Sequence, residues 1–236
     1  MEKTLSDIKY NYETIVENIA KAAIDSGRRP EDITFLAATK TVDPVLINYA
    51  ISLGLDHIGE NKVQELLSKY DSYDLDNSQL HFIGHLQSNK VRQIVGKVSM
   101  IQSVDSLKLA QEISRQSQKQ GITTKILVEV NVGDEASKSG VSPEALDELL
   151  PQIALLDNIS VDGLMAIPPI CENEQKIRGY FQIMRKLFID ISHKNIDNIS
   201  MNTLSMGMSG DYREAILEGA TLVRIGSSLF GARNYN

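Results

Sequence analysis

The sequence predicts an α/β fold, a single (β/α)8 barrel with one additional helix at its N-terminal end. Three observations lead to this expectation. The 236 residues are 42% hydrophobic and 23% charged, which is ordinary for a globular chain and within the size of one barrel. Short apolar runs alternate with helical patterns along the chain, and no linker interrupts the series. We therefore expect residues 1–236 to form one domain.

The N-terminal segment has the pattern of an amphipathic helix. Its apolar residues recur at steps of three and four, which places them on one face of a helix. They are Leu5, Ile8, Tyr12, Ile15 and Ile19, followed by Ala22 or Ala23. Gly27 is the expected stop. Because this helix precedes the first strand, we expect it to cover one end of the barrel or to join the outer ring.

The apolar runs after this helix are interpreted as strands. They are residues 33–40, 56–59, 80–84, 98–102, 125–130, 159–167, 198–205 and 221–226. The run at 33–40 is continuous rather than alternating, which suits a strand covered on both faces. Each run but the last precedes a helix or a segment of helical length. Asp43-Pro44 and Ser142-Pro143 are expected helix starts, and residues 177–191 carry the clearest apolar stripe.

Alternation of strands and helices requires a parallel sheet, because parallel neighbours need a crossover and crossovers are nearly always right-handed helices. An open doubly wound sheet is the competing architecture, and it normally carries a glycine-rich turn after its first strand. The chain reads ATKTVDP at residues 38–44 instead. This observation favours the closed barrel.

Composition narrows the classes of partner. The 24 basic and 31 acidic residues give a net charge of −7, so we expect neither nucleic acid nor an anionic membrane surface as a partner. Cys171 stands alone, which excludes an intrachain disulfide and suits a reducing compartment. Since no apolar stretch approaches the length of a membrane span, we expect a cytoplasmic protein. The spacing of His, Cys, Asp and Glu predicts no metal site.

Lys40 is the most informative candidate for chemistry. In a barrel, functional groups gather where the strands end, and Lys40 follows an apolar strand directly. Partial burial disfavours the ammonium and makes the neutral amine available to attack an aldehyde and form a Schiff base. The alternative is a lysine at a strand end that extends into solvent.

Two loops at neighbouring strand ends suit a phosphate. We expect residues 205–211, SMGMSGD, to follow the seventh strand, with Ser209 capping a helix that begins near Gly210. Residues 224–228, RIGSS, finish the eighth strand. Glycine amides and helix N-termini bind phosphate in the corresponding loops of other barrels. The alternative is that these glycines only make tight turns.

A Schiff-base lysine and a phosphate cup are the two attachment points of pyridoxal 5′-phosphate, the aldehyde cofactor derived from vitamin B6. We therefore expect this cofactor. A different phosphorylated metabolite remains the alternative.

Motifs over nearly the whole chain then make the sequence similar to the pyridoxal phosphate homeostasis protein family. The most specific are HFIGHLQSNK at 81–90 and SMGMSGDYREAI at 205–216, followed by RIGSSLFGAR at 224–233. Further matches are LAATK at 36–40, HIGENKVQE at 57–65, QSVDS at 102–106, SKSG at 137–140 and DGLMAIPP at 162–169. Leu80 departs from the family, which usually has a large aromatic residue there, and we expect this change to alter only packing behind the third strand.

The resemblance implies a barrel similar to the N-terminal domain of alanine racemase, with pyridoxal phosphate bound and no established catalytic turnover. It implies the following cofactor-binding residues: Lys40 as Schiff-base partner, Asn61 beside the ring, Met208 lining the pocket, Ser209, Gly226 and Ser227 on the phosphate, and Arg224 facing the pyridine nitrogen. Members are regarded as carriers or regulators of free cofactor, and apoenzymes that depend on the cofactor are expected recipients. Since the chain stops at Asn236, without a second domain of the racemase type, a monomer is the simpler expectation.

Arg224 makes amino-acid chemistry on the ring less assisted, although some racemases of this fold type tolerate the same arrangement. Its guanidinium only donates hydrogen bonds and stays charged, so it opposes protonation of the ring nitrogen and makes the ring a poorer electron sink. A weak racemase, decarboxylase or lyase is nevertheless the alternative function. The roles of other candidates stay open: His81 is interpreted as structural, His85 lies nearer the mouth, and Lys62, Lys90 and Lys138 form either a basic rim or an ordinary solvated surface.

Overall fold

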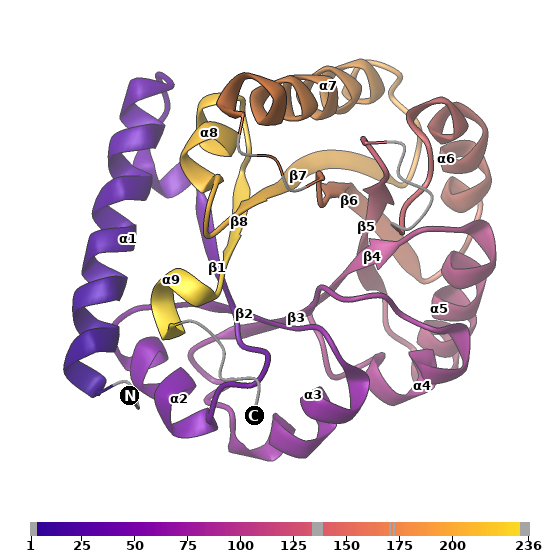
Figure 1. Ribbon diagram of the computed structural model, residues 1–236. Helices are drawn as coiled ribbons and strands as arrows, with labels where there is room; N and C mark the ends of the chain where they lie inside the picture. Colours follow the sequence, from indigo (N-terminus) through magenta and orange to yellow (C-terminus); the bar gives the residue numbers. More distant parts are fainter. Residues whose placement is uncertain (1–3, 134–138, 170, 172, 232–236) are drawn as a thin grey trace.

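A computed structural model describes residues 4–133, 139–169, 171 and 173–231. Within these ranges the strands form one closed parallel barrel in sequence order (Figure 1). They are β1 Thr34–Ala38, β2 His57–Glu60, β3 Gln79–Phe82, β4 Met100–Val104, β5 Thr124–Val130, β6 Ile159–Ala166, β7 Ile199–Met208 and β8 Leu222–Ile225. Each strand overlaps the apolar run predicted for it. The expected α/β class and (β/α)8 barrel are confirmed.

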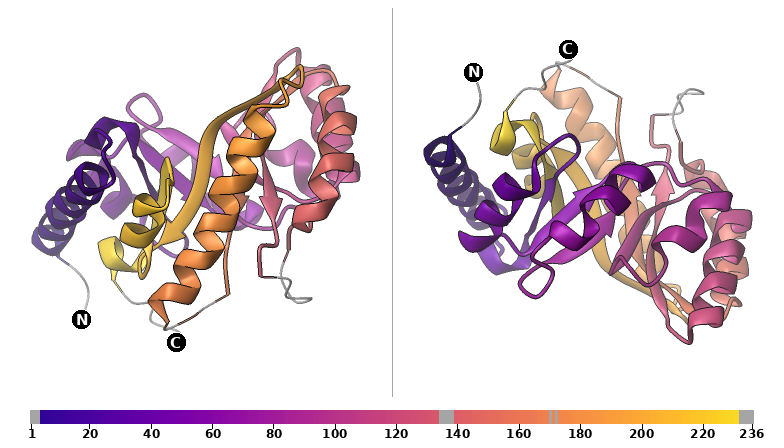
Figure 2. Two further views of the ribbon diagram at one scale, coloured as in Figure 1. Left: turned by 90° about the horizontal axis from the view of Figure 1, so that it is seen from above. Right: turned by 90° about the horizontal axis from the view of Figure 1, so that it is seen from below.

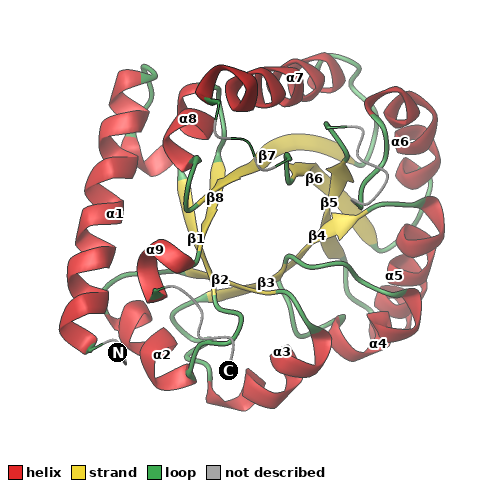
Figure 3. Cartoon of the chain, viewed as in Figure 1, coloured by secondary structure: helices red, strands yellow, loops and turns green. Residues whose placement is uncertain are grey.

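Helices surround the ring of strands (Figure 3). They are α1 Leu5–Asp25, α2 Pro44–Ser52, α3 Val63–Lys69, α4 Val91–Ile94, α5 Leu107–Gln120, α6 Leu146–Ala154, α7 Glu174–Ser192, α8 Tyr212–Leu217 and α9 Ser227–Phe230. Asp43 caps α2 as predicted, since its side chain accepts a hydrogen bond from the amide of Val45. No helix within the described ranges has the length and apolarity that crossing a bilayer requires.

The N-terminal helix α1 joins the outer ring. The two views of Figure 2 show it outside the strands, on the side of α8 and α9. Thr4 and Asp7 form a capping box at its start. Ile8, Ile15 and Ile19 are buried on its inner face. Of the two places expected for this helix, the structure therefore supports the outer ring.

Two kinds of core hold the barrel. The large apolar core lies between the outward faces of the strands and the helices, as expected for parallel strands covered by crossovers. Inside the ring are two small apolar clusters. Leu36, Ile83 and Leu222 form one, and Met100, Leu127 and Met165 form the other. Polar side chains also enter this interior, and they build part of the candidate site.

β7 is longer than the sequence pattern predicted. We expected a loop from Ser205 onward, but the strand continues through Met208. Residues 205–207 are buried, which explains why a polar and glycine-containing stretch stays in the sheet. Gly207 has a φ of +91°, and a Cβ there would lie 2.5 Å from the Cβ of Ala215. This glycine therefore lets α8 pack closely on the strand end.

Candidate functional site

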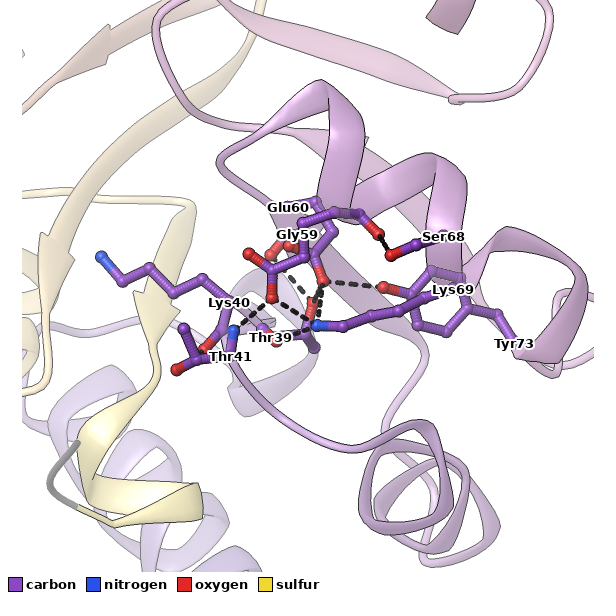
Figure 4. A network of polar contacts seen from close by, with 9 residues as sticks. Thr39, Lys40, Thr41, Gly59, Glu60, Ser68, Lys69 and Tyr73 are labelled. Carbon is purple, nitrogen blue, oxygen red and sulfur yellow. Dashed lines mark hydrogen bonds and ion pairs between the residues drawn. The ribbon is translucent and has the colours of Figure 1, made fainter. Parts of the chain in front are cut away.

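Lys40 projects into the mouth of the barrel, because side chains alternate between the two faces of a strand. Leu36 belongs to an interior cluster, and Ala38 packs against that cluster. Lys40 continues the same face two residues later and is half-buried. Figure 4 shows its side chain directed away from the polar cluster that surrounds Thr39. Lys40 lies two residues after the last residue of β1, at the strand end expected for it.

A buried acidic cluster lies behind Lys40, and the sequence analysis missed it. Glu60 is fully buried at the end of β2. One of its carboxylate oxygens accepts hydrogen bonds from Thr39 Oγ1 at 2.8 Å, Tyr73 OH at 2.7 Å and Lys69 Nζ at 3.1 Å (Figure 4). The signal that could have found the cluster is an acidic residue at a buried strand end, followed by Glu65 and Lys69 four residues apart on a helix.

Asn61 follows β2 at the mouth and is held by contact with Gly84. A Cβ on Gly84 would lie 2.1 Å from the carbonyl oxygen of Asn61, so only glycine allows this approach. Ser103 Oγ donates a hydrogen bond to the Gly84 carbonyl at 2.5 Å. In the described part of the chain, Asn61 Oδ1 is buried and has no hydrogen-bond partner. A buried acceptor without a partner is costly, and it suits a ligand that donates a hydrogen bond.

The tight contact predicts the effect of Gly84→Ala. The new methyl group must displace the Asn61 backbone, and overpacking of this kind costs roughly 1–3 kcal/mol in the free energy of unfolding. Urea denaturation measures this loss. Gly179→Ala on α7 is the control, because no atom lies within 4 Å of the position that its new methyl group would take, and the substitution favours the helix. An equal effect of the two substitutions would contradict the proposed contact.

Arg224 lies inside the barrel at the end of a chain of hydrogen bonds. Its Nη2 donates to the Ala166 carbonyl at 2.9 Å, and its Nη1 donates to Ser205 Oγ. Ser205 Oγ in turn donates to Gln102 Oε1 at 2.7 Å, and Gln102 Nε2 lies 2.9 Å from His81 Nδ1. Because Ser205 Oγ donates to the Gln102 oxygen, the Gln102 amide nitrogen donates to His81 Nδ1, and neutral His81 then carries its proton on Nε2.

Burial and nearby carboxylates set the charges around Arg224. Burial lowers the pKa of Arg224 to about 10, while Glu129 and Asp211 act in the opposite direction, so the guanidinium stays charged at neutral pH. Burial raises the pKa of Glu129 to about 7, although the charge of Arg224 lowers it. Burial likewise raises the pKa of Asp211, against the hydrogen bond from the Met208 amide. A cationic group that only donates hydrogen bonds therefore lies in the barrel interior.

The two loops expected to hold phosphate do meet. Ser209 Oγ accepts hydrogen bonds from the amides of Gly226 at 3.2 Å and Ser228 at 3.3 Å. Gly226 also packs closely on β1, since a Cβ there would lie 3.1 Å from the Ala38 carbonyl oxygen. Ser227 is exposed and begins α9. Met208 is paired in register with Arg224 and is half-buried.

The expected helix cap at Ser209 is wrong. Helix α8 begins at Tyr212 rather than near Gly210, and Asp211 occupies its N-cap position. The Ser209 hydroxyl accepts from the loop after β8 instead, because the longer β7 brings it beside that loop. On its other side, the Ser209 loop lines a hollow of about 380 Å³ against α1, where Asn11, Thr14 and Asn18 face it.

The remaining candidates lie at the rim or elsewhere. His81 is buried in the interior, in agreement with its structural interpretation. His85 is exposed, and its Nδ1 lies 3.5 Å from Asp105 Oδ2 and 3.3 Å from Ser139 Oγ. Lys62 is exposed and Lys90 is half-buried. Lys138 lies outside the described residues.

Comparison with known proteins identifies the family. Residues 34–234 match the family described as the alanine racemase N-terminal domain. The chain belongs to the alanine racemase N-terminal domain family. The pyridoxal phosphate homeostasis protein of Aquifex aeolicus is 46% identical over 222 residues, which cover 94% of this chain and 96% of that protein. Its namesake in Escherichia coli is 36% identical over 235 residues, covering 98% and 99% of the two chains. The resemblance to pyridoxal phosphate homeostasis proteins is therefore confirmed.

A solved structure shows the same relationship. PipY from Synechococcus elongatus, with pyridoxal phosphate bound, superposes with a TM-score of 0.79 and 31% identity, covering 90% of this chain and all of that one. Within the alanine racemase N-terminal domain family, the chain thus resembles a protein whose structure contains the cofactor.

Proposed function

We propose that this protein binds pyridoxal 5′-phosphate through Lys40 and serves in pyridoxal phosphate homeostasis as a carrier or buffer. The observation that carries the proposal is that Lys40, Asn61, Ser209 and Arg224 lie at the C-terminal ends of β1, β2, β7 and β8 of one closed barrel. The names of the relatives support the same function. When bound, the cofactor supplies an aldehyde that reacts reversibly with amines.

The residues at the mouth fit this group. Asn61 Oδ1 is a buried acceptor without a partner in the described residues, which suits a hydrogen-bond donor on the ligand. The Gly226 backbone packs so closely on β1 that a side chain there would collide with Ala38, which suits a glycine at this strand end. Ser209 Oγ holds that amide at present. We propose that Ser209, Gly226 and Ser227 hold the phosphate, that Met208 lines the pocket, and that Arg224 faces the pyridine nitrogen.

Arg224 supports a carrier over an efficient enzyme. Its two described hydrogen bonds leave further N–H groups on a guanidinium that cannot accept a hydrogen bond from a protonated ring nitrogen. A ring with an unprotonated nitrogen withdraws electron density less strongly from an attached amino acid. The alternative function, a weak racemase, decarboxylase or lyase, predicts exchange of amino-acid α-hydrogens in deuterated water that depends on Lys40. Absence of exchange across a broad panel of amino acids would exclude it.

The setting and partners follow from the same proposal. We propose a monomeric, cytoplasmic protein that delivers the cofactor to apoenzymes. The single cysteine and the net charge of −7 support a reducing compartment and argue against nucleic acid or anionic membranes as partners.

The test of this function is spectroscopic and chemical. The purified protein, saturated with pyridoxal phosphate, should be yellow, and borohydride should abolish the absorption band while fixing the cofactor to the chain. Peptide mapping by mass spectrometry should place the added mass on Lys40. A protein that stays colourless at saturation would point to a different phosphorylated metabolite, and an adduct at another lysine would refute the assignment.

Ser209→Ala tests the phosphate loops separately. The loss of one hydroxyl contact to a charged phosphate should cost on the order of 1.5–3 kcal/mol of binding, a roughly tenfold to hundredfold weaker affinity. The covalent link should persist because Lys40 is unchanged. Equilibrium titration of the absorption band measures the affinity, and Ser192→Ala at the end of α7 is the control. Unchanged affinity would place the phosphate elsewhere.

A further inference from the structure

Helix α3 holds both peptide groups that flank Lys40. The carbonyl oxygen of Thr39, on the N-terminal side, accepts a hydrogen bond from Lys69 Nζ at 3.1 Å. The amide of Thr41, on the C-terminal side, donates to a carboxylate oxygen of Glu65. Glu65 and Lys69 lie one turn apart on α3 and are themselves paired at 2.6 Å. Two side chains of one short helix therefore hold the backbone on each side of the reactive amine.

The held backbone is strained. Thr41 has a φ of +63°, in the left-handed region that a β-branched residue rarely adopts. Such a conformation persists only where the surrounding contacts determine it. Its amide bond to Glu65 is one such contact, and the bond from its own hydroxyl to the Lys40 carbonyl at 2.6 Å is another. The turn that follows Lys40 is thus imposed by its neighbours.

The side chains of Glu65 and Lys69 are themselves held by further contacts. Lys69 Nζ lies 3.1 Å from the fully buried carboxylate of Glu60, which also accepts from Tyr73 and Thr39. Burial, with the nearby charge of Glu60, raises the pKa of Tyr73 far above its ordinary value, so its hydroxyl remains a donor. Burial alone would raise the pKa of Glu65, but the hydrogen bonds from Lys69 and Thr41 outweigh it and lower the pKa. Tyr73 therefore remains a hydrogen-bond donor and Glu65 a carboxylate acceptor at neutral pH.

We propose that Glu65 and Lys69 are positioning residues, which orient Lys40 toward the aldehyde of the bound cofactor by fixing the two peptide groups beside it. Neither residue needs to touch the cofactor, because each acts through the backbone at Lys40. The proposal rests on the proposed function of Lys40. It assigns to α3 a role that the sequence motif alone did not reveal.

The experiment measures how fast pyridoxal phosphate attaches to Lys40 in the full chain. The absorption band is followed by stopped flow, and borohydride trapping with peptide mapping confirms the residue. We expect Glu65→Leu and Lys69→Met each to slow attachment at least tenfold. Glu65→Gln keeps an acceptor for the Thr41 amide, so its rate should stay within threefold of the unchanged protein. Arg178→Met is the matched control, since it breaks a similar 2.6 Å ion pair with Glu218 far from Lys40.

A second measurement separates positioning from charge. Removal of Glu65 takes away a negative charge and removal of Lys69 a positive one, so an electrostatic role would shift the pH dependence of attachment in opposite directions. If Glu65 and Lys69 act by positioning, attachment is slower in both variants at every pH. Formaldehyde and cyanoborohydride methylate Lys40 reductively. The rate of this methylation in both variants should stay within threefold of the wild-type rate, because a small aldehyde needs no orientation.

The outcomes distinguish a failure of the proposed function from a failure of the positioning role. If the unchanged protein attaches no cofactor at Lys40, the proposed function and the positioning role both fail. If it does, and the two variants attach at the rate of Arg178→Met or shift oppositely with pH, the positioning role alone is refuted. If Lys69→Met does not fold, the comparison of Glu65→Leu with Glu65→Gln still decides, since equal rates in that pair would refute the proposal.

Discussion

Lys40→Ala is expected to abolish the borohydride-stable adduct and to weaken retention of pyridoxal phosphate about a hundredfold, which corresponds to roughly 2.7 kcal/mol. The cofactor is attached at two ends in our proposal, and the covalent link at one end holds it at high effective concentration against the phosphate contacts at the other. Without the amine, only those contacts remain. Equilibrium dialysis measures the retention, and mass spectrometry of the reduced protein measures the adduct.

The fold should tolerate this substitution. Lys40 is half-buried at the mouth, outside the apolar clusters, so the free energy of unfolding should change by about 0.5 kcal/mol or less. Lys62→Ala, on the exposed N-cap of α3, is the matched control and should keep both adduct and affinity. An adduct that survives in Lys40→Ala would mean that another lysine is the attachment point.

The strands and Lys40 could be predicted because their signals are local. A run such as residues 33–40 is apolar at successive positions, and the two-residue period of a strand then decides which face each side chain takes. The alternation from Leu36 to Lys40 needs no knowledge of other strands. The barrel mouth follows in turn from the parallel arrangement, because all the strands end at the same side.

The hydrogen bonds that link Arg224 to His81, and the acidic cluster around Glu60, could not be predicted in the same way. Gln102 and Ser205 are 103 positions apart, and only the closed barrel brings their side chains to 2.7 Å. Local pattern also misassigned Ser209, because a serine before a helix is typical of a cap whereas here the hydroxyl contacts a loop 17 positions later. Polar groups that pair across the fold leave no periodic signal, so their partners appear only in three dimensions.

His81 should make the protein lose stability as the pH falls from 6.5 toward 3. Burial, followed by the charges of His57 and Lys125, lowers the pKa of His81 to about 3, while a histidine in the unfolded chain has a pKa of about 6.5. Between these values the unfolded chain binds a proton that the native protein does not. The stabilisation is therefore complete well above pH 6.5 and is lost by about 1.4 kcal/mol per pH unit below it, up to roughly 5 kcal/mol.

Glu129 acts with the opposite sign in part of the same range. Its pKa is raised to about 7, so the native protein binds its proton more tightly than the unfolded chain does, and this contribution grows as the pH falls toward 4.5. A comparison of the unchanged protein with His81→Gln removes that contribution, because both contain Glu129. The glutamine oxygen can still accept a hydrogen bond from Gln102 Nε2, so the hydrogen bonds between this position and Arg224 are kept.

Urea unfolding at pH 6.5 and pH 4.5 measures the difference. Over these two pH units the wild-type protein should lose about 2.3 kcal/mol more than His81→Gln does, because the unfolded histidine is already half protonated at pH 6.5. The two proteins would lose the same amount if His81 were protonated in the native state, and Gln102 Nε2 would then face a ring nitrogen that also donates. Since two donors cannot share a hydrogen bond, that result would require the Gln102 amide to be turned over, so that its oxygen faces His81 and its nitrogen donates to Ser205 Oγ.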